Sequence, residues 1–367
     1  MSKKRTTKQD LSKIIKSAPL ITIGNTSVDE FKTFSPSVNK NLESLIEISP
    51  NVNIYNCEDP DKIQIKYGID KYKCVKWDSK LAETEMLKNI RASKINSDKV
   101  VAPMQVNNNC WFNCFFMIFF IDDKGRKFFR YLRETMVTGI LPSKKKIPKS
   151  LHKTFFMLNR YIDGSIMGYK DTSEYALAMD TNVIIQRIGN ELNKKQETEG
   201  KKQRDYSGYG NPLVFYQEII DYLKDEPVFL LEFEGSYPNI RDLKVNKKLK
   251  IPDIIIVSLS KKESAEFKKK ISLEIGEYSY MLSSIVLNDM LSSHFSAYIT
   301  IDDEEYAFDG RSYNRLNSFD WSNNINKDSP MVWSSKNTDS NDFTSFSPND
   351  TVFNFKKGYQ QLFYYRV

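Results

Sequence analysis

The stretch from Gln105 to Phe120 limits the possible folds of this chain more than any other, because a polar turn leads directly into an apolar run. Three asparagines precede Cys110, and asparagine favours tight turns and helix starts. Nearly all of the residues that follow are aromatic or aliphatic, which predicts a helix buried on every side. The run is too short to cross a membrane, and Asp122 and Asp123 end it. The sequence therefore predicts a loop that enters a central helix with Cys110 in its first turn.

Cys110 has the expected surroundings of a nucleophile. A helix start carries partial positive charge and unpaired N–H groups, and both favour the thiolate, which is the reactive form of cysteine. Gln105, five residues upstream, can direct an amide N–H at an oxyanion that forms beside the sulfur. The alternative is a core helix in which Cys110 and Cys114 are simply buried. The stretch by itself leaves both interpretations open.

The composition is that of a soluble protein with a packed core. The chain has 367 residues, 40% of them hydrophobic, which suffices for one large domain or two ordinary ones. The net charge of +7 comes from lysines interleaved with acids, and no domain-wide basic motif predicts a nucleic-acid partner. Residues 1–16 are basic and polar, without an apolar secretion segment. No membrane partner is expected either.

The four cysteines predict a reducing compartment, because they are too few and too irregular for a disulfide framework. Cys57 and Cys74 have no histidine or second cysteine pair nearby, so we expect buried small residues and no zinc site. No cofactor is predicted. The expected location is cytoplasmic or nuclear. Abundant Lys, Asn and Ile suggest an A+T-rich genome, such as that of a virus or protist acting inside a host cell.

Helical patterns come first and strand patterns later, which is an α+β layout. Residues 1–97 are expected to form a basic amino-terminal region, disordered over 1–17, with strand-like runs such as 62–67. The unbroken β-branched run at 254–257 predicts a strand buried on both faces. Further helices are expected at 126–138, at 151–162, from Asp171 or Thr172 to about 194, and from Pro212 with Asn211 as cap. Further strands are expected at 228–233, 280–287, 294–301, 306–308 and 361–367. Loops are expected at 195–210 and 314–354.

The chain has two histidines in different settings. His152 lies beside Lys149 and Lys153 in a basic stretch that is expected to be exposed. His294 begins an alternating strand that returns, after a turn rich in acids, to Asp309.

The length of that turn decides what His294 can do. If the loop is the two residues Asp302 and Asp303, Ser296 pairs with Asp309, and His294 projects from the same face within side-chain reach. Asp309 could then hold the imidazole, as the third member of a catalytic triad does. A loop of opposite parity would place His294 and Asp309 on opposite faces, which would leave an ordinary hairpin.

Six segments in order resemble the ubiquitin-specific protease family of deubiquitinases, which are papain-like cysteine proteases. The resemblance runs from about Ala102 to Val367. Any one segment is weak, but six in the right order are specific. The segments are 109–114, similar to the cysteine box; 211–223, similar in apolar pattern and at Asp221 to the helix of the Gln-Asp box; 251–259, like the strand in which Leu-Pro precedes an aliphatic run; 280–287; 294–298 with 306–309, similar to the histidine box and its return strand; and 359–364, like the closing strand.

This resemblance implies a papain-like α+β fold of a divergent ubiquitin-specific protease type, in which a helical lobe packs on an antiparallel sheet. Residues 98–367 would be the catalytic domain, and residues 1–97 have no assigned role. By position, Cys110 is the implied nucleophile, His294 the general base and then acid, and Asp309 the orienting carboxylate. Gln105 falls where the family has its oxyanion-hole asparagine.

The implied activity is that of a thiol-dependent ubiquitin carboxyl-terminal hydrolase, which cleaves (iso)peptide bonds after the C-terminal diglycine of ubiquitin or a ubiquitin-like modifier. Conjugates of these modifiers are the implied partners. The chain departs from the family in three respects. Ser293 replaces a glycine that usually precedes the histidine. The Gln-Asp-Ala-x-Glu-Phe pattern before Phe215 and the paired zinc-binding cysteines are missing from the sequence. Two alternatives follow: a cysteine protease for another ubiquitin-like modifier or a precursor protein, and an inactive module that binds ubiquitin.

Overall fold

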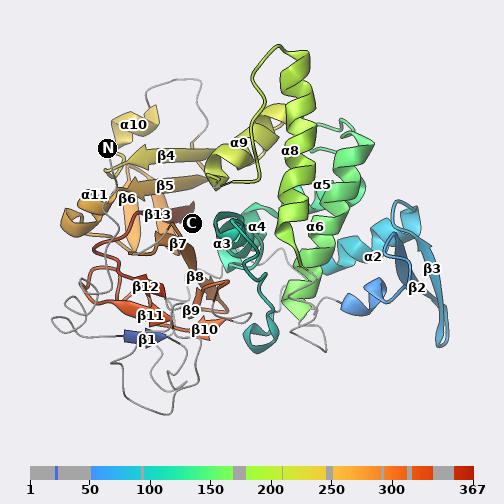
Figure 1. Ribbon diagram of the computed structural model, residues 1–367, viewed down its shortest axis with the longest axis horizontal. Helices are drawn as coiled ribbons and strands as arrows, with labels where there is room; N and C mark the ends of the chain where they lie inside the picture. Colours follow the sequence, from blue (N-terminus) through green and yellow to red (C-terminus); the bar gives the residue numbers. More distant parts are fainter. Residues whose placement is uncertain are drawn as a thin grey trace. The chain divides into compact units, whose positions relative to one another are not determined.

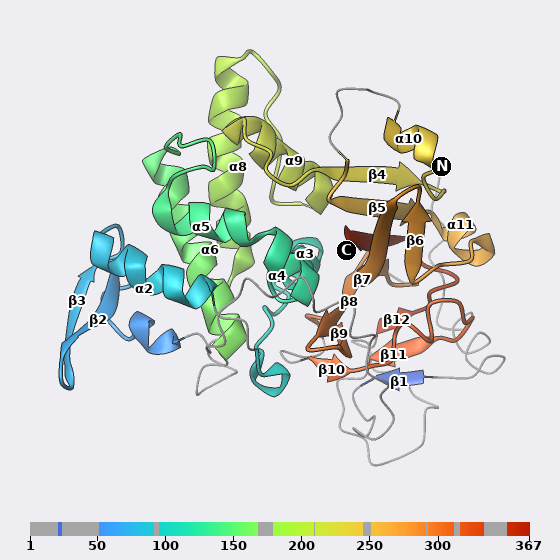
Figure 2. The ribbon, with the colours of Figure 1, turned by 180° about the vertical axis from the view of Figure 1, so that it is seen from behind.

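The protein forms two compact units, which we describe separately. The helical unit comprises the described residues between 51 and 227 except 122–124, and the sheet unit comprises 21–23, 122–124 and the described residues from 228 on. Figures 1 and 2 show the chain from opposite sides. The computed structural model describes residues 21–23, 51–91, 95–167, 179–208, 210–244, 251–290, 293–311, 316–333 and 351–367. The disorder expected over 1–17 lies outside these residues. The helix expected to run from Asp171 or Thr172 begins at Thr181, with Asp180 as its cap, and positions 171 and 172 lie outside the described residues.

The helical unit is built around the predicted central helix, α3, which begins at Cys110 and has all of its residues buried. Helix α9 begins at Pro212, and the side chain of Asn211 accepts hydrogen bonds from the N–H groups of Leu213 and Val214, as the cap pattern predicts. No helix among the described residues is both long and apolar enough to cross a membrane. The elements are β2 (Lys62–Gly68), β3 (Lys71–Lys76), α2 (Lys80–Ile90), α3 (Cys110–Phe120), α5 (Arg130–Thr138), α6 (Lys149–Met167), α8 (Thr181–Thr198) and α9 (Pro212–Leu223).

Two helix predictions need correction. The helix expected over 126–138 is two helices, α4 (Asp123–Phe128) and α5, which are separated at Phe129. Phe129 is the cap residue before α5, and its ring is fully buried and stacks on Phe119 at a centroid distance of 3.8 Å. Helix α8 continues to Thr198, four residues into the segment expected to be a loop.

Residues 51–91 pack against the helices that follow. Ile63 and Ile65 of β2 and Trp77 form one apolar core with Phe156 of α6. Buried polar groups join the same elements: Asp163 of α6 accepts a 2.5 Å hydrogen bond from the Tyr55 hydroxyl and forms an ion pair of 2.5 Å with Arg133 of α5. Breaking such a pair would strand a buried charge. This segment is therefore an integral part of the helical unit.

The prediction that Cys57 and Cys74 are buried small residues is confirmed for Cys57 and wrong for Cys74, which is exposed. The two form a disulfide, which was not expected. Their Cα atoms are 6.1 Å apart, within the usual range for a disulfide. The contact arises from the hairpin, where β3 returns antiparallel to β2 and places Cys74 opposite Gln64. No local pattern signals such a pairing.

The sheet unit contains a mixed, mostly antiparallel sheet. Strand β5 is buried along its whole length between β13 and β4, as its β-branched run predicts. The expected antiparallel sheet is confirmed except at one edge, where β4 pairs with β5 in parallel. The sheet contains β4 (Leu230–Glu234), β5 (Ile254–Leu259), β6 (Ser272–Ile275), β7 (Tyr278–Asn288), β8 (Phe295–Ile301), β9 (Glu304–Phe308), β10 (Asn317–Ser318) and β13 (Gln360–Arg366), in the order β10-β9-β8-β7-β13-β5-β4 with β6 beside β7.

A smaller sheet in the same unit consists of β1 (Ile21–Ile23), β11 (Met331–Trp333) and β12 (Thr351–Phe353). Strands β10, β11 and β12 lie in the stretch 314–354, which was expected to be mainly loop. Two short helices, α10 (Ile240–Lys244) and α11 (Lys261–Glu266), complete the unit.

The sequence left the length of the turn between β8 and β9 open, and in the structure this turn has two residues. Asp302 and Asp303 both have positive φ, at 50° and 65°, and Ile301 pairs with Glu304. Two consecutive residues of positive φ are the signature of a type I′ turn, which matches the twist of the flanking strands. The pairing runs back to Ala297 opposite Phe308, which is the register that places His294 and Asp309 on one face.

Residues 122–124, which follow the cap residue Ile121 of α3, belong to the sheet unit. One carboxylate oxygen of Asp122 accepts hydrogen bonds of 3.0 Å from the Ser283 hydroxyl and from the N–H of Thr300. Asp123 accepts a hydrogen bond of 2.7 Å from the N–H of Asp302 in the β8–β9 turn. Both carboxylates are fully buried. They fasten the segment that follows the central helix to strands β7 and β8.

Candidate active site

Cys110 is the first residue of α3, and Asn109 is the cap before it. The side chain of Cys110 is 3% exposed, whereas Cys114, one turn further on, is fully buried. Cys110 thus occupies the position where helix N–H groups point outward and the helix dipole favours negative charge.

The loop that leads to Cys110 is held by amide side chains on both sides. Asn113, fully buried in α3, donates hydrogen bonds to the carbonyl oxygens of Pro103 at 3.3 Å and Met104 at 3.1 Å. Asn182, near the start of α8, donates a hydrogen bond of 2.7 Å to the carbonyl oxygen of Val106. These contacts fix the backbone that carries Gln105.

Thr181 links Asn113 in α3 to Asn109, the cap residue before α3. Its hydroxyl donates a hydrogen bond of 2.6 Å to Oδ1 of Asn113 and accepts one of 2.9 Å from Nδ2 of Asn109. The Oδ1 atom of Asn109 in turn accepts a hydrogen bond of 2.9 Å from the N–H of Val106. Thr181, Asn109 and Asn113 are all fully buried. We call these three residues the Thr181 clamp; buried networks of this kind are rigid when every member is satisfied.

Gln105 makes a different contact from the one that the sequence suggested. Its Nε2 donates a hydrogen bond of 2.8 Å to the carbonyl oxygen of Asn107 in the same loop. Asn107 has a positive φ of 57°, which turns the loop back on itself. A primary amide has two N–H bonds, and this contact uses one of them.

His294 and Asp309 form a buried pair in the sheet unit. Nε2 of His294 lies 2.5 Å from Oδ1 of Asp309, and the side chains are 2% and 0% exposed. Asn288 and Asp289 hold the backbone of His294, because the Asn288 side chain and the Asp289 N–H both donate to its carbonyl oxygen. Asp309 therefore orients the imidazole ring, and Asn288 and Asp289 hold the backbone that carries it.

Asp309 has further partners that keep it ionised. Thr351 of β12 donates a hydrogen bond of 2.6 Å to Oδ2, and the N–H of Arg311 donates one of 2.9 Å to Oδ1. Burial raises the pKa of Asp309, but the charge of His294 and the hydrogen bonds from His294, Thr351 and Arg311 outweigh burial and hold the pKa below its usual value. A carboxylate that stays charged can stabilise an imidazolium ion.

The four residues expected to form the site occur as two pairs. Gln105 and Cys110 belong to one loop and helix of the helical unit, and His294 and Asp309 are in contact in the sheet unit. His152 belongs to neither pair. The expectation that His152 is exposed is wrong: it is half-buried, its Nε2 lies 3.0 Å from the carbonyl oxygen of Val137, and its ring packs edge-on against Trp77 at 4.7 Å.

Sequence reasoning missed Thr181 and Thr351. An available signal for Thr181 was the run of polar residues 180–182 at the start of an apolar periodic stretch, since Asp180 is the cap of α8. No local signal identifies Thr351, which is 42 residues from Asp309.

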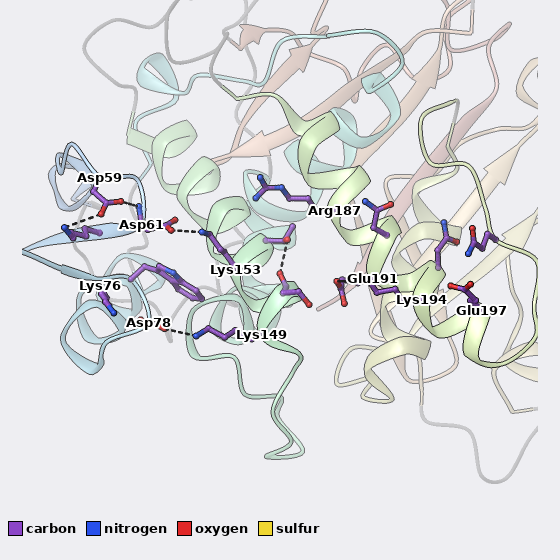
Figure 3. A pocket seen from close by; sticks show the side chains of 17 residues that line it. Asp59, Asp61, Lys76, Asp78, Lys149, Lys153, Arg187, Glu191, Lys194 and Glu197 are labelled. Carbon is purple, nitrogen blue, oxygen red and sulfur yellow. Dashed lines mark hydrogen bonds and ion pairs between the residues drawn. The ribbon is translucent and has the colours of Figure 1, made fainter.

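A separate open groove of about 960 Å³ lies in the helical unit between the β2–β3 segment and helices α6 and α8. Many of its charges are paired: Lys153 lies 2.6 Å from Asp61, and Lys149 lies 3.9 Å from Asp78 (Figure 3). The described residues that line it include no cysteine or histidine. The groove therefore lacks a thiol nucleophile and an imidazole base.

The described residues contain no group of three or more His, Cys, Asp or Glu side chains arranged to hold a metal ion. The two pairs supply a thiol, an imidazole, a carboxylate and amide N–H donors.

No protein-family model matches this chain, and no curated protein matches it. Among solved structures, the chain is similar to a SAGA DUB module of Ubp8, Sgf11, Sus1 and Sgf73 bound to monoubiquitin, with 11% identity, a TM-score of 0.38 and coverage of 75% of this chain and 71% of the other. The chain is also similar to a structure of the Ubp8-Sgf11-Sgf73-Sus1 SAGA DUB module, with 10% identity, a TM-score of 0.39 and coverage of 76% of this chain and 70% of the other. A third similar structure is that of an essential yeast splicing factor, with 9% identity, a TM-score of 0.32 and coverage of 74% of this chain and 70% of the other. Likenesses at these TM-scores assign neither a fold family nor an activity.

Proposed function

We propose that this protein is a cysteine-dependent hydrolase that cleaves (iso)peptide bonds after the C-terminal diglycine of ubiquitin or a ubiquitin-like modifier. The observation that carries the proposal is the buried His294–Asp309 pair with its 2.5 Å contact. Of the two turn lengths that the sequence allowed, the two-residue loop is the one that permits this contact. The choice of a diglycine substrate is supported by the six sequence segments between Ala102 and Val367 that occur in the same order as in ubiquitin-specific proteases.

In the proposed reaction, Nδ1 of His294 takes the proton of the Cys110 thiol, because Nε2 faces Asp309. The sulfur attacks the carbonyl carbon of the last glycine and forms a tetrahedral intermediate. His294 then gives the proton to the leaving lysine amine, which departs as the thioester forms. Water, deprotonated by His294, hydrolyses the thioester and restores the thiol. The negative charge of Asp309 stabilises the imidazolium at each transfer.

The oxyanion of the intermediate requires donors beside Cys110. The proposal assigns this role to the second N–H of the Gln105 amide and to outward-facing backbone N–H groups at the start of α3. The Thr181 clamp supports this assignment, because Asn109 and Asn113 bond to backbone atoms of Pro103, Met104 and Val106 in the Gln105 loop.

The proposal also takes residues 98–367 as a papain-like catalytic domain of the ubiquitin-specific protease type, with residues 51–91 packed against the helices of its helical part. It requires Cys110 and His294 to meet during the reaction.

Incubation with ubiquitin and a panel of ubiquitin-like modifiers that carry C-terminal electrophiles tests the proposal. We expect a covalent adduct with at least one modifier and hydrolysis of the matching fluorogenic C-terminal amide. A modifier that binds without an adduct or hydrolysis would instead support an inactive binding module. If no modifier in the panel binds or reacts, the proposed substrate class is wrong.

A further inference from the structure

The tip of the β2–β3 hairpin concentrates exposed apolar side chains. Ile69 is 90% exposed, Tyr67 58% and Tyr72 53%, and these three lie within six consecutive residues. The other large apolar side chains that are exposed in the described part of the chain are scattered, at Leu81, Ile140, Val214 and Val367. Single exposed apolar residues are ordinary, but a cluster marks a surface that binds something.

The tip carries an aromatic ring and a lysine on each of its two faces. Lys73 pairs with Ile65, whose side chain is on the buried face, and its Nζ lies 5.5 Å from the ring centroid of Tyr67. Lys66 pairs with Tyr72 on the opposite face, where its Nζ lies 6.0 Å from the ring centroid. The apolar tip is therefore two-sided rather than a flat patch on one face.

The hairpin is strongly basic for its size. Residues 62–76 contain five lysines and a single acid, Asp70, which gives a formal charge of +4 within a chain of net charge +7. Lys71 and Lys73 lie at the tip with Lys66, whose Nζ is 3.8 Å from the Asp70 carboxylate. An anionic surface complements this charge.

The base of the hairpin is firmly held while its tip is not covered. Ile63 and Ile65 are buried in the core of the helical unit, and the Cys57–Cys74 disulfide ties β3 to the segment before β2. Every residue from 66 to 74 is exposed. Figures 1 and 2 show the turn pointing away from α2. Four residues beyond Ile65 correspond to a reach of about 13 Å, enough for the turn to pass through a layer of lipid headgroups.

We propose that this tip binds an anionic lipid surface, with Ile69 at the acyl boundary, Tyr67 and Tyr72 among the headgroups and the lysines against their negative charges. Tyrosines and lysines favour that depth, and apolar insertion combined with basic charge gives reversible attachment. A bilayer interface surrounds both faces of the ribbon, whereas a protein surface meets one face. A nucleic acid would pair with the lysines but would leave the aliphatic Ile69 unburied. The binding departs from the sequence expectation of no membrane partner.

Asp70 provides an internal test of the proposal, because it opposes insertion beside Ile69. Its side chain is 87% exposed, and its φ of 51° is one that asparagine also tolerates. Asp70→Asn should therefore strengthen binding without disturbing the turn. Ile69→Asp should weaken it. Both positions are exposed, so neither change threatens the fold.

The experiment is co-sedimentation of the full chain with vesicles of phosphatidylcholine alone or mixed with phosphatidylserine, at low and high salt. We expect binding only to the mixed vesicles, weakened by salt. Ile69→Asp should reduce binding roughly tenfold and Asp70→Asn should increase it at least about twofold. The control is Leu81→Ser, which removes an exposed apolar side chain from α2 and should leave binding unchanged.

Three outcomes would overturn the proposal. One is the absence of sedimentation with mixed vesicles at low salt. Another is equal binding by the wild type and both tip variants, which would leave only general electrostatic adsorption. The third is binding to single-stranded DNA, measured in parallel by fluorescence anisotropy, that competes fully with the vesicles and does not depend on Ile69. Circular dichroism spectra that match the wild type confirm that each variant is folded.

Discussion

The imidazole of His294 approaches the carboxylate of Asp309 to 2.5 Å at Nε2, although 15 residues separate the two in the chain. The contact exists because a two-residue turn brings β9 back along β8 in a single register. It orients the ring, and in the proposed reaction proton transfer is left to Nδ1 because Nε2 faces Asp309. The first prediction tests this role.

Replacing His294 by alanine should abolish turnover of a diglycine substrate, whereas His152→Ala should not. Loss of a general base costs roughly 10²–10⁴-fold or more in rate. His152 is engaged with Val137 and Trp77 in the helical unit, so its replacement should lower only stability. Steady-state kinetics of both folded variants decide the matter. Comparable activity losses in the two would remove the special role of His294.

Asp309→Asn should lower kcat with little change in KM, since the carboxylate acts on His294 and not on the substrate. An asparagine has nearly the same shape but cannot supply the negative charge that stabilises the imidazolium. The kcat and KM of the variant should be measured over a range of pH. Unchanged turnover would mean that another residue orients His294.

Thr351 should act as a positioning residue for Asp309. Thr351→Val removes the hydroxyl that donates to Oδ2 and preserves the side-chain shape. We expect a smaller fall in kcat than in Asp309→Asn, and Thr351→Ser should restore it. A matched control is Val352→Ile, a conservative change at the next position. Equal kcat values in Thr351→Val and the wild type would contradict the role.

The two cysteines of α3 should differ in reactivity. Cys110 lies at the helix start, whereas Cys114 is fully buried among Phe115 and Phe116. A modifier with a C-terminal electrophile should label the wild type and Cys114→Ser but not Cys110→Ala. The buried serine should cost about 1–3 kcal/mol of stability. Peptide mapping that places the adduct on Cys114 would refute the assignment of the nucleophile.

Thr181→Val should loosen the loop that carries Gln105. The valine leaves Asn109 and Asn113 without their shared partner, and a misplaced loop costs up to roughly 10²-fold in rate. We expect faster amide hydrogen exchange over residues 103–109 and a lower kcat at similar KM, both restored in Thr181→Ser. Ile184→Val, in the same helix, is the control. Hydrogen exchange reports on the clamp even if the substrate is misidentified, and unchanged exchange would count against the clamp.

Stability of the sheet unit should depend on the ionisation of Glu305. Burial raises its pKa to about 7, despite the opposing hydrogen bond from the N–H of Ser322. Because the folded pKa lies above the unfolded value, the protonated form stabilises the fold below about pH 4.5, and this contribution is lost as pH rises through about 7.

Glu305→Gln should therefore become more stable than the wild type as pH rises from 5 to 8, by roughly 3 kcal/mol at most. Glutamine keeps an oxygen that can accept from Ser322. Chemical denaturation at several pH values measures the difference, with the exposed Glu266→Gln as the control. A stability gap that does not change with pH would show that Glu305 ionises normally.

Features that depend on neighbouring residues were predictable from the sequence. The helix start at Cys110 and the capped start of α9 follow from local backbone preferences and apolar periodicity. The register of β8 and β9 follows from the length of one turn, so the His294–Asp309 contact was accessible as one of two alternatives.

Contacts between distant segments had no such signal. The parallel pairing of β4 with β5, the Cys57–Cys74 disulfide and the hydrogen bond from Thr351 to Asp309 each join residues whose local sequences do not depend on one another. By itself the sequence determined the starts of α3 and α9 and the buried strand β5, because dihedral preferences and side-chain periodicity act within a few residues. Only the tertiary structure decided which threonines support the two pairs at the candidate site, because burial brings donors and acceptors together regardless of their separation in the chain.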